Sequence, residues 1–309
     1  MEHFSRRKFL GAAAGSLAWQ AAMSSRLRAN PLGLPIGLQL WTVREELERD
    51  LGGTLQQIAQ IGYREVELFE LPAASKLYRK ERFSGVGLNC VSGHFYLDEF
   101  RSQRTIDAAK ELGLKYMIVV FPTLRSLSDR EVSKMKFEDL VPLYEEITLD
   151  DYKWNAEQFN RLGEQLQRAG LQLGYHNHAV DLKRFGDAVA FDTLIELTDP
   201  RLVTFEMDCG HVIHAGADPI AYLRKYRTRI GLLHLKDLKA GFETSTTLDT
   251  ESKDVNTELG AGQIDWPRLF RAAKECDIKH YFVEHEGKMD HSPMEAIKLS
   301  YEFLHRMPS

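Results

Sequence analysis

Short apolar runs alternate with amphipathic stretches along most of the chain. The first run covers residues 36–41, and apolar side chains at helical spacing follow at Leu55, Ile58 and Ile61, just before Gly62. Seven further apolar runs cover residues 64–69, 87–94, 116–121, 171–176, 202–208, 229–235 and 280–285. We predict a strand in each run, and helices over residues 51–61, 73–83, 101–112, 155–169, 188–197, 219–226, 266–276 and 293–305.

Strands that alternate with helices favour parallel pairing through right-handed crossovers. We therefore predict an α/β fold in which residues 30–309 form a single (β/α)8 TIM barrel. The alternative is a doubly wound open sheet, but no glycine-rich fingerprint follows the first strand, so its dinucleotide-binding version has no support. Two long segments near residues 122–153 and 238–263 interrupt the alternation, and we expect them to be loops over the active-site mouth.

The first 29 residues have a different character. The basic cluster Arg6, Arg7 and Lys8 precedes Phe9, Leu10 and a short run of alanine, glycine and leucine. This pattern resembles a twin-arginine export signal, which implies a transient contact with the export machinery and a periplasmic localisation. Cleavage after Ala29 or after an earlier small residue stays open, and the alternative is a flexible N-terminal extension.

The composition argues against a membrane anchor, a nucleic-acid partner and a disulfide framework. A chain of 309 residues that is 43% hydrophobic can bury one large core, and no later run of eighteen apolar residues indicates a stable membrane anchor. The net charge of −5 would become −9 after cleavage at Ala29, which argues against a nucleic-acid partner. The odd set Cys90, Cys209 and Cys276 indicates isolated thiols and not a disulfide framework. A homo-oligomer stays open.

The segment from Phe205 to His211 carries the first indication of chemistry. It is apolar enough to be a buried strand, yet Glu206 and Asp208 share one of its faces, and His211 follows where the strand turns. A buried carboxylate must pair, take up a proton or bind a cation. We interpret Asp208 as a metal ligand.

Polar pairs also end the neighbouring predicted strands. In a TIM barrel the carboxyl ends of the strands build the active site. A single buried histidine would most often be a hydrogen-bonded core residue, but four coincident pairs favour a site: His176 with His178, Glu206 with Asp208, His234 with Lys236, and Glu284 with Glu286. One member of each pair, namely His176, Asp208, His234 and Glu284, gives a nitrogen and oxygen set that suits one divalent ion such as Mn²⁺, Co²⁺, Zn²⁺, Fe²⁺ or Mg²⁺.

Five motifs, at residues 174–178, 207–211, 233–237, 258–266 and 282–286, resemble those of the xylose isomerase-like TIM barrel superfamily. The likeness covers residues 36–304 and points to the branch of sugar phosphate isomerases/epimerases, inosose dehydratases and ketose 3-epimerases. It implies one metal held by Glu, Asp, His and Glu, of which Asp208, His234 and Glu284 match the last three. His176 stands where ketose epimerases carry glutamate, and whether His176 or His178 is the ligand stays open.

This departure changes the chemistry that the resemblance implies. A symmetric epimerisation between two carboxylates loses one partner, although a histidine can also transfer protons near neutral pH. A reaction with one base remains possible, and we predict Glu284 as that base. Lys236 or His211 would stabilise the developing oxyanion or protonate the leaving group.

The amino-terminal half of the barrel offers candidate substrate contacts. Trp41 presents a flat apolar face for a sugar ring, and Glu67 and His94 can hydrogen-bond hydroxyl groups. His178 is expected to face the substrate. For Glu67 the alternative is a salt bridge at the barrel rim.

We therefore predict a metal-dependent isomerase, epimerase or lyase that acts on a small sugar, keto-sugar or cyclitol by removing a proton beside a metal-polarised carbonyl. As a lyase it would be dehydratase-like and act on a keto-sugar or a keto-glycoside. The alternative is an exported sugar-binding protein that kept the barrel without chemistry. A third hypothesis, DNA repair of the endonuclease IV type, is disfavoured by the acidic balance. The exact substrate, the bond changed and the metal stay open.

Overall fold

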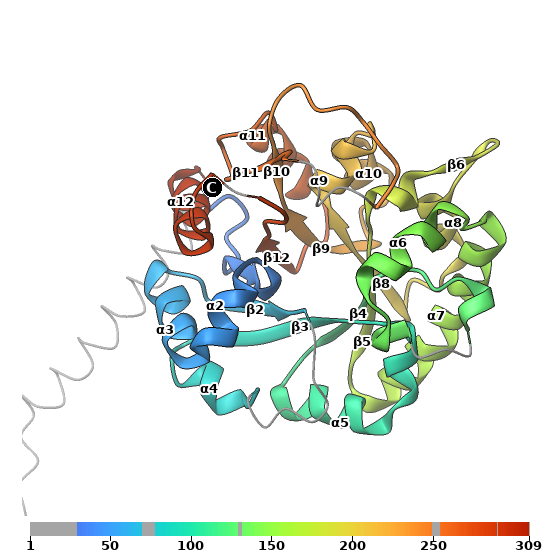
Figure 1. Ribbon diagram of the computed structural model, residues 1–309, viewed down its shortest axis with the longest axis horizontal. Helices are drawn as coiled ribbons and strands as arrows, with labels where there is room; N and C mark the ends of the chain where they lie inside the picture. The colour runs from blue at the N-terminus through green and yellow to red at the C-terminus, as the bar shows by residue number, and fades with distance from the viewer. Residues whose placement is uncertain (1–29, 70–77, 129–131, 249–253, 289, 309) are drawn as a thin grey trace, which may run out of the picture.

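Eight parallel strands form a closed barrel in the order β1-β12-β9-β8-β5-β4-β3-β2 (Figure 1). The computed structural model describes residues 30–69, 78–128, 132–248, 254–288 and 290–308, so the predicted signal at 1–29 lies outside the described residues. The barrel strands are β1 (Gly37–Gln39), β2 (Glu65–Leu68), β3 (Asn89–Phe95), β4 (Tyr116–Val119), β5 (Gln172–His176), β8 (Val203–Asp208), β9 (Ile230–Leu235) and β12 (His280–Val283). The predicted TIM barrel is confirmed.

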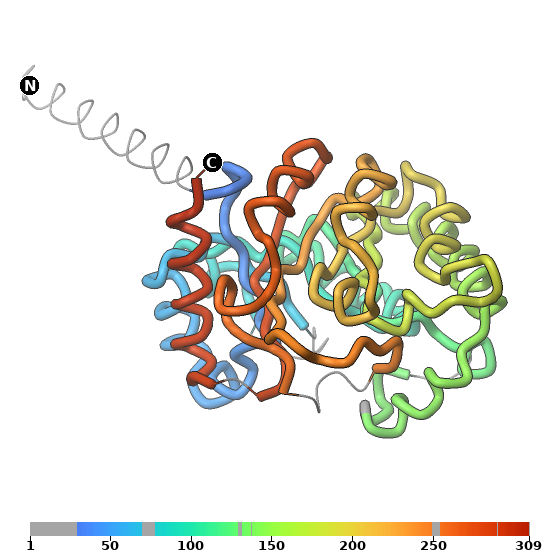
Figure 2. The backbone as a smooth tube through the Cα atoms, turned by 90° about the horizontal axis from the view of Figure 1, so that it is seen from above, coloured from blue at the N-terminus to red at the C-terminus, as the bar shows by residue number. Residues whose placement is uncertain are grey.

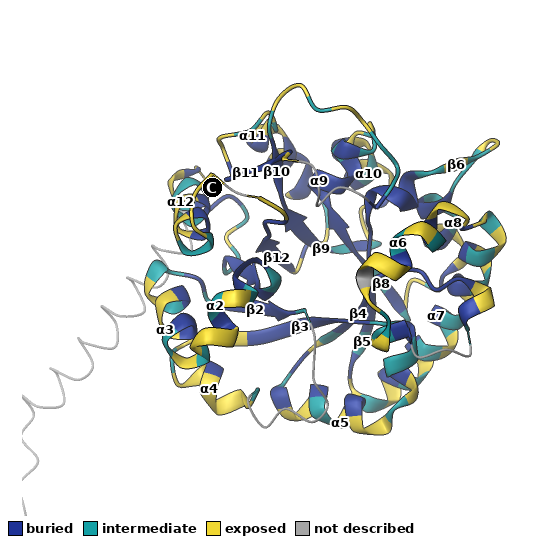
Figure 3. Cartoon of the chain, in the orientation of Figure 1, coloured by how far each residue is buried: buried dark blue, intermediate teal, exposed yellow. Residues whose placement is uncertain are grey.

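Helices surround the barrel and turn their polar faces outward, so that exposed residues lie on the periphery and buried ones on the strands (Figure 3). The outer helices include α3 (Leu51–Ile61), α4 (Lys80–Ser84), α5 (Gln103–Leu112), α7 (Leu149–Ala169), α8 (Ala190–Leu197), α10 (Pro219–Lys225), α11 (Trp266–Ala273) and α12 (Pro293–Arg306). Helix α12 packs against α3, so the two ends of the ring meet (Figure 2). Among the described residues no helix is long and apolar enough to cross a membrane.

Shorter elements lie on the connections between strands and outer helices. They are helices α2 (Arg44–Arg49), α6 (Phe137–Glu145) and α9 (Cys209–His214), and 3-10 helices at Leu40–Val43, Leu97–Arg101, Arg125–Leu127, Val132–Lys134 and Ala179–Leu182. Two small antiparallel pairs, β6 (Arg184–Phe185) with β7 (Ala188–Val189) and β10 (Asp237–Leu238) with β11 (Asn256–Thr257), complete the fold. The expected turn after Asp208 is therefore the helix α9.

Several predicted boundaries were wrong. Helix α7 begins at Leu149 and not at residue 155, because Thr148 and Asp151 form a capping box in which Asp151 Oδ2 accepts from Thr148 N at 2.9 Å. Part of the predicted loop 122–153 is thus helical, as expected, but it ends earlier. The predicted helix at 73–83 overlaps α4 only from Lys80, and residues 70–77 lie outside the described part of the chain.

The interior of the barrel is divided along its axis. Val91, Ile118, Leu232 and Phe282 form a small apolar cluster inside the ring of strands. Because strand side chains repeat every two residues, Leu232 lies beneath His234 and Phe282 beneath Glu284 on the inward face. An apolar plug therefore supports a layer of polar groups at the carboxyl ends of the strands.

Asp237 ties the long segment after β9 to the barrel. Its Oδ1 accepts from the backbone N–H groups of Leu238 at 2.9 Å and Ile264 at 3.2 Å. Its Oδ2 accepts from Gly260 N at 2.9 Å and from Trp266 Nε1 at 2.7 Å. One buried carboxylate thus satisfies four donors and fixes both ends of the predicted mouth loop.

Replacing Asp237 with alanine is expected to lower the free energy of unfolding by about 3–5 kcal/mol, because several buried donors lose their acceptor together. Urea titration followed by circular dichroism measures this loss. The matched control is Asp265→Ala, which removes the N-cap bond to Arg268 N and should reduce stability by only about 1 kcal/mol. Equal losses in the two variants would contradict an anchoring role for Asp237.

Candidate active site

Four donor groups from four adjacent strands converge at the carboxyl end of the barrel. One ligand atom from each of His176, Asp208, His234 and Glu284 lies within 4.8 Å of the others, and all four residues are buried. Two other groups of the described residues meet the same distance limit, one formed by His94, His176, Glu206 and His234 and one by His176, His178 and His211. The first set is the group that the sequence predicts as the metal ligands.

Asp208 is oriented by its own backbone surroundings. Its Oδ1 accepts from His211 N at 2.7 Å, and its backbone N–H donates to Asn177 Oδ1 at 3.0 Å. Within the described residues Oδ2 accepts no hydrogen bond, although Lys236 Nζ makes an ion-pair contact with it at 3.2 Å. A buried carboxylate oxygen without a hydrogen bond fits a role as a cation ligand.

Two further carboxylates lie behind the histidines of this set. Glu206 Oε2 is 3.1 Å from His176 Nδ1, and Glu67 Oε2 is 2.5 Å from His234 Nε2. The other ring nitrogen of His234, Nδ1, lies 3.0 Å from Glu284 Oε2. A carboxylate on one ring nitrogen fixes the tautomer and leaves the opposite nitrogen for a metal.

His94 joins these two carboxylates. Its Nε2 lies 2.9 Å from Glu206 Oε2 and 3.2 Å from Glu67 Oε2. Burial opposes protonation of His94, but Glu67 and Glu206 outweigh it and raise its pKa to about 9. Glu67 also accepts from Gln39 Nε2 at 2.9 Å and is completely buried, so it supports the site from below and is not among the residues that line the cavity.

The charges of the site leave room for a divalent cation. The carboxylates are opposed by Lys236, by His94 and by His234, whose pKa is raised because nearby carboxylates outweigh its burial. Burial and neighbouring histidines lower the pKa of His176 and His178, which are therefore neutral near pH 7. Five buried acidic residues surround these groups, namely Glu67, Glu206, Asp208, Glu284 and Glu286, and His234 would bind a metal as the neutral imidazole after it gives up its added proton. The residues present therefore fit a divalent metal ion.

Lys236 lies inside a cage of carboxylates. Its ammonium nitrogen is 2.7 Å from Glu286 Oε2, 3.1 Å from Glu284 Oε2 and 3.1 Å from His211 Nε2. Burial disfavours the charged amine, but Asp208, Glu284 and Glu286 outweigh that effect and raise the pKa of Lys236 well above its usual value. Lys236 is thus a permanent cation that holds the acidic groups together.

A cavity of about 390 Å³ opens above these groups. His176, Glu284 and Glu286 line its polar end. The predicted substrate residues Trp41, His94 and His178 also line the cavity. His211 and Lys236 instead line a small adjoining cavity. Arg44, Phe69, Tyr96 and Phe121 also line the cavity but were not predicted from the sequence. Phe69 and Phe121 end predicted strands, and Tyr96 lies two residues after one.

Replacing Glu67 with glutamine is expected to weaken metal binding about tenfold, because His234 loses the acceptor that fixes its tautomer. Isothermal titration with Mn²⁺ or Zn²⁺ measures the affinity. The matched control is Glu65→Gln, since Glu65 lies on the same strand and bonds His280 at 2.7 Å, away from the ligand set. An unchanged metal affinity in Glu67→Gln would show that Glu67 does not act through His234.

The fold and site define a class, the closed β/α barrels whose strands carry histidine and carboxylate groups suited to a metal ion at their carboxyl ends. Residues 55–307 match the family described as xylose isomerase-like TIM barrel, and the chain belongs to this family. The resemblance seen in the sequence is thereby confirmed at the level of the superfamily.

Relatives of known name agree with this assignment. An inosose dehydratase of Geobacillus kaustophilus is 25% identical over 279 residues, which cover 82% of this chain and 86% of that protein. A sugar phosphate isomerase/epimerase of Parabacteroides distasonis superposes with a TM-score of 0.69 at 25% identity, over 89% of this chain and 94% of that one. The IolI protein, solved with a zinc atom, shares the fold at 17% identity, with a TM-score of 0.62 over 87% of this chain and 96% of that one. The protein is thus an enzyme of this family.

Proposed function

We propose that the protein is a metal-dependent lyase of the dehydratase type, or an isomerase, that acts on a keto-sugar or a cyclitol ketone. The observation that carries this proposal is the convergence of His176, Asp208, His234 and Glu284 within 4.8 Å at the floor of the cavity. The named relatives, an inosose dehydratase and a sugar phosphate isomerase/epimerase, support the substrate class.

A divalent cation bound by these four residues would polarise a substrate carbonyl and so acidify the neighbouring C–H bond. Glu284 lines the cavity and is the proposed base. Burial opposes its ionisation, but Lys236 and His234 outweigh burial and lower its pKa to about 2, so its carboxylate is ionised at neutral pH.

The groups on the two sides of the cavity floor differ, and this asymmetry favours elimination. Glu284 and Glu286 are ionised on one side, whereas His176 and His178 are neutral on the other. In a dehydration the C–H bond breaks and its proton passes to Glu284, and the C–O bond of the hydroxyl on the next carbon breaks. That hydroxyl leaves as water after it receives a proton.

His211 is the better candidate for this second proton. Lys236 holds its proton tightly between carboxylates, and a group with a strongly raised pKa is a poor acid. His211 Nε2 lies 3.5 Å from Glu286 Oε2, and Glu286 lines the cavity. We therefore propose that a protonated His211 gives its proton to the Glu286 carboxylate, which passes it to the leaving hydroxyl and returns to its ionised form, while Lys236 compensates charge.

The direct test is to incubate the metal-loaded protein with keto-sugars and inososes in D₂O and to follow the products by NMR. Elimination gives an unsaturated ketone, whereas isomerisation or epimerisation leaves solvent deuterium on carbon in a saturated product. A protein that binds metal but shows neither exchange nor elimination with any of these compounds would refute the proposal.

We also propose that the chain is exported by the twin-arginine route, on the basis of Arg6 and Arg7. Changing both to lysine is expected to lower the exported fraction about tenfold or more, because the receptor reads the arginine pair. Cell fractionation and immunoblotting measure this fraction. Changing Arg26 and Arg28 to lysine is the control and should leave export intact, and equal export of both variants would contradict the assignment.

A further inference from the structure

The mouth of the barrel carries one aromatic side chain after each of four adjacent strands. Trp41 lies two residues beyond β1, Phe69 follows β2 directly, Tyr96 follows β3 directly, and Phe121 lies two residues beyond β4. These strands are neighbours in the barrel, and all four side chains line the cavity. We call this set the aromatic wall.

The other four strands supply the polar floor of the same cavity. β5 and β12 bring His176, His178, Glu284 and Glu286 to the lining, and β8 and β9 provide Asp208 and His234 beneath them. The cavity therefore has a reactive half and an aromatic half, each built by four consecutive barrel strands. Its volume of about 390 Å³ is in the range of sites for ligands larger than a single sugar ring.

Contacts between side chains hold the aromatic wall in place. Trp41 and Phe69 meet edge to face with ring centroids 5.4 Å apart, and Tyr96 lies 6.1 Å from Phe121. Phe121 in turn stacks on His178 at 4.2 Å, which joins the wall to the reactive half. Because these rings support one another, the wall is organised before any ligand arrives.

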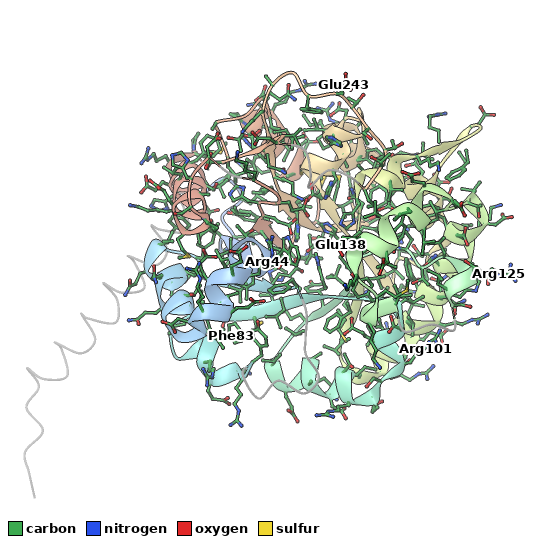
Figure 4. The ribbon with its side chains drawn as sticks, in the orientation of Figure 1. Arg44, Phe83, Arg101, Arg125, Glu138 and Glu243 are labelled. Atoms are coloured by element: carbon green, nitrogen blue, oxygen red, sulfur yellow. The ribbon has the colours of Figure 1, made fainter. Side chains whose placement is uncertain are left out.

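Arg44 fixes the outer end of the wall. Its guanidinium lies 4.0 Å from the ring centroid of Trp41, and Nη1 donates to Trp41 O at 3.0 Å. Glu138 lies on α6 and also lines the cavity. Figure 4 shows Arg44 and Glu138 over the middle of the barrel, whereas Arg101 and Arg125 lie toward its outer edge.

The charge of the lining disfavours an anionic ligand. Among the described residues that line the cavity, Arg44 and His94 are the cations, and they are opposed by the three carboxylates of Glu138, Glu284 and Glu286. A phosphate group would require several donors of positive charge or a helix N-terminus directed at it. A neutral ligand with apolar ring faces fits this lining better.

We propose that the aromatic wall binds a second ring, so that the substrate is a neutral glycoside and not a free monosaccharide. The reacting sugar would lie over the reactive half, as the proposed function requires, and the ring joined to it would pack its face on Trp41 and Phe69. Both a second sugar and an aryl group present flat apolar faces to aromatic side chains. Arg44 and Glu138 at the rim would hydrogen-bond polar groups of that ring.

The test compares ligands that differ only in the second ring. Calorimetry on the metal-loaded protein would measure binding of glucose, methyl glucoside, phenyl glucoside and a glucosyl disaccharide, each glycoside in both anomeric forms. We expect the phenyl glucoside or the disaccharide to bind about tenfold more tightly than the methyl glucoside. A gain for only one of the two identifies the second ring as aryl or sugar.

Variants test which residues cause the tighter binding of the two-ring ligands. Trp41→Ala and Phe69→Ala should each remove most of the difference in affinity between the two-ring ligands and methyl glucoside. Trp154→Ala is the matched control, because Trp154 is also a half-buried tryptophan but lies on α7 outside the cavity lining, and it should keep the full gain. Two variants are used so that poor folding of one does not decide the result.

The proposal is overturned if neither two-ring ligand binds more tightly than methyl glucoside, or if the gain survives in both Trp41→Ala and Phe69→Ala. Its failure is distinct from failure of the proposed function. The protein could catalyse deuterium exchange or elimination on a keto-monosaccharide and show no preference for a second ring. This result would support the proposed chemistry and refute the proposal that the substrate is a glycoside.

Discussion

Replacing Glu284 with glutamine is expected to lower turnover about 10²- to 10⁴-fold, because the amide cannot accept the proton that leaves carbon. Glutamine keeps an oxygen that can bind a metal, so the loss should fall mainly on the chemical step. The measurement is steady-state turnover of a keto-sugar together with the rate of solvent deuterium exchange. Both rates are expected to fall together, since both require the same proton abstraction.

The design must separate loss of the base from loss of the metal. Turnover is therefore measured at saturating metal, and elemental analysis confirms equal loading of the wild type and the variant. Glu286→Gln is compared with it, because Glu286 also lines the cavity and contacts Lys236. As the proposed carrier of the second proton, Glu286 should be needed for elimination but not for deuterium exchange. If Glu284→Gln keeps deuterium exchange within a fewfold of the wild type while Glu286→Gln loses it, Glu286 is the base.

Much of the fold follows from the sequence because the pattern of a barrel repeats. Each apolar run must be buried on both faces, and each helix shows one apolar face, so eight repeats predict closure. The ends of individual helices are harder to predict than the strands. Thr148 and Asp151 have the residue types and spacing of a capping box, so the sequence contains the start signal of α7. The first turn of this helix lies in a polar segment without apolar periodicity, which is why the start was predicted too late.

The candidate ligands could be predicted for a related reason. The i, i+2 pairs at the strand ends have a fixed direction, so His176, Asp208, His234 and Glu284 had to face the same opening. The contacts between side chains on opposite strands depend on distances across the barrel, and a local sequence pattern does not give these distances. The contact between Glu67 on β2 and His234 on β9 joins strands that are not neighbours, and it emerges only in three dimensions.

The sequence also does not distinguish Lys236 from His211 as the acid for the leaving group. From the sequence both are basic residues near the site, and either could act as an acid. The structure separates them by surroundings, since three carboxylates contact Lys236 and bind its proton firmly. The aromatic wall could not be predicted from the sequence either, because its members follow four separate strands that become neighbours only in the closed barrel.

Replacing His234 with alanine is expected to weaken metal binding about a hundredfold or more while the barrel stays folded. The variant removes a ligand nitrogen and also leaves Glu67 and Glu206 without the imidazole that lies 2.5 and 3.2 Å from their oxygens. Buried carboxylates that lose a partner destabilise a protein, so the metal-free variant should also lose about 3 kcal/mol of unfolding free energy. Elemental analysis and urea titration measure the two effects.

A double-mutant cycle with Glu67→Gln gives the sharper test. If Glu67 acts by orienting His234, then adding Glu67→Gln to His234→Ala should cause no further loss of metal affinity, although each single change weakens binding. Additive losses would mean that Glu67 affects the metal independently of this histidine. Unchanged metal stoichiometry in His234→Ala would remove His234 from the ligand set and contradict the proposed four-residue site.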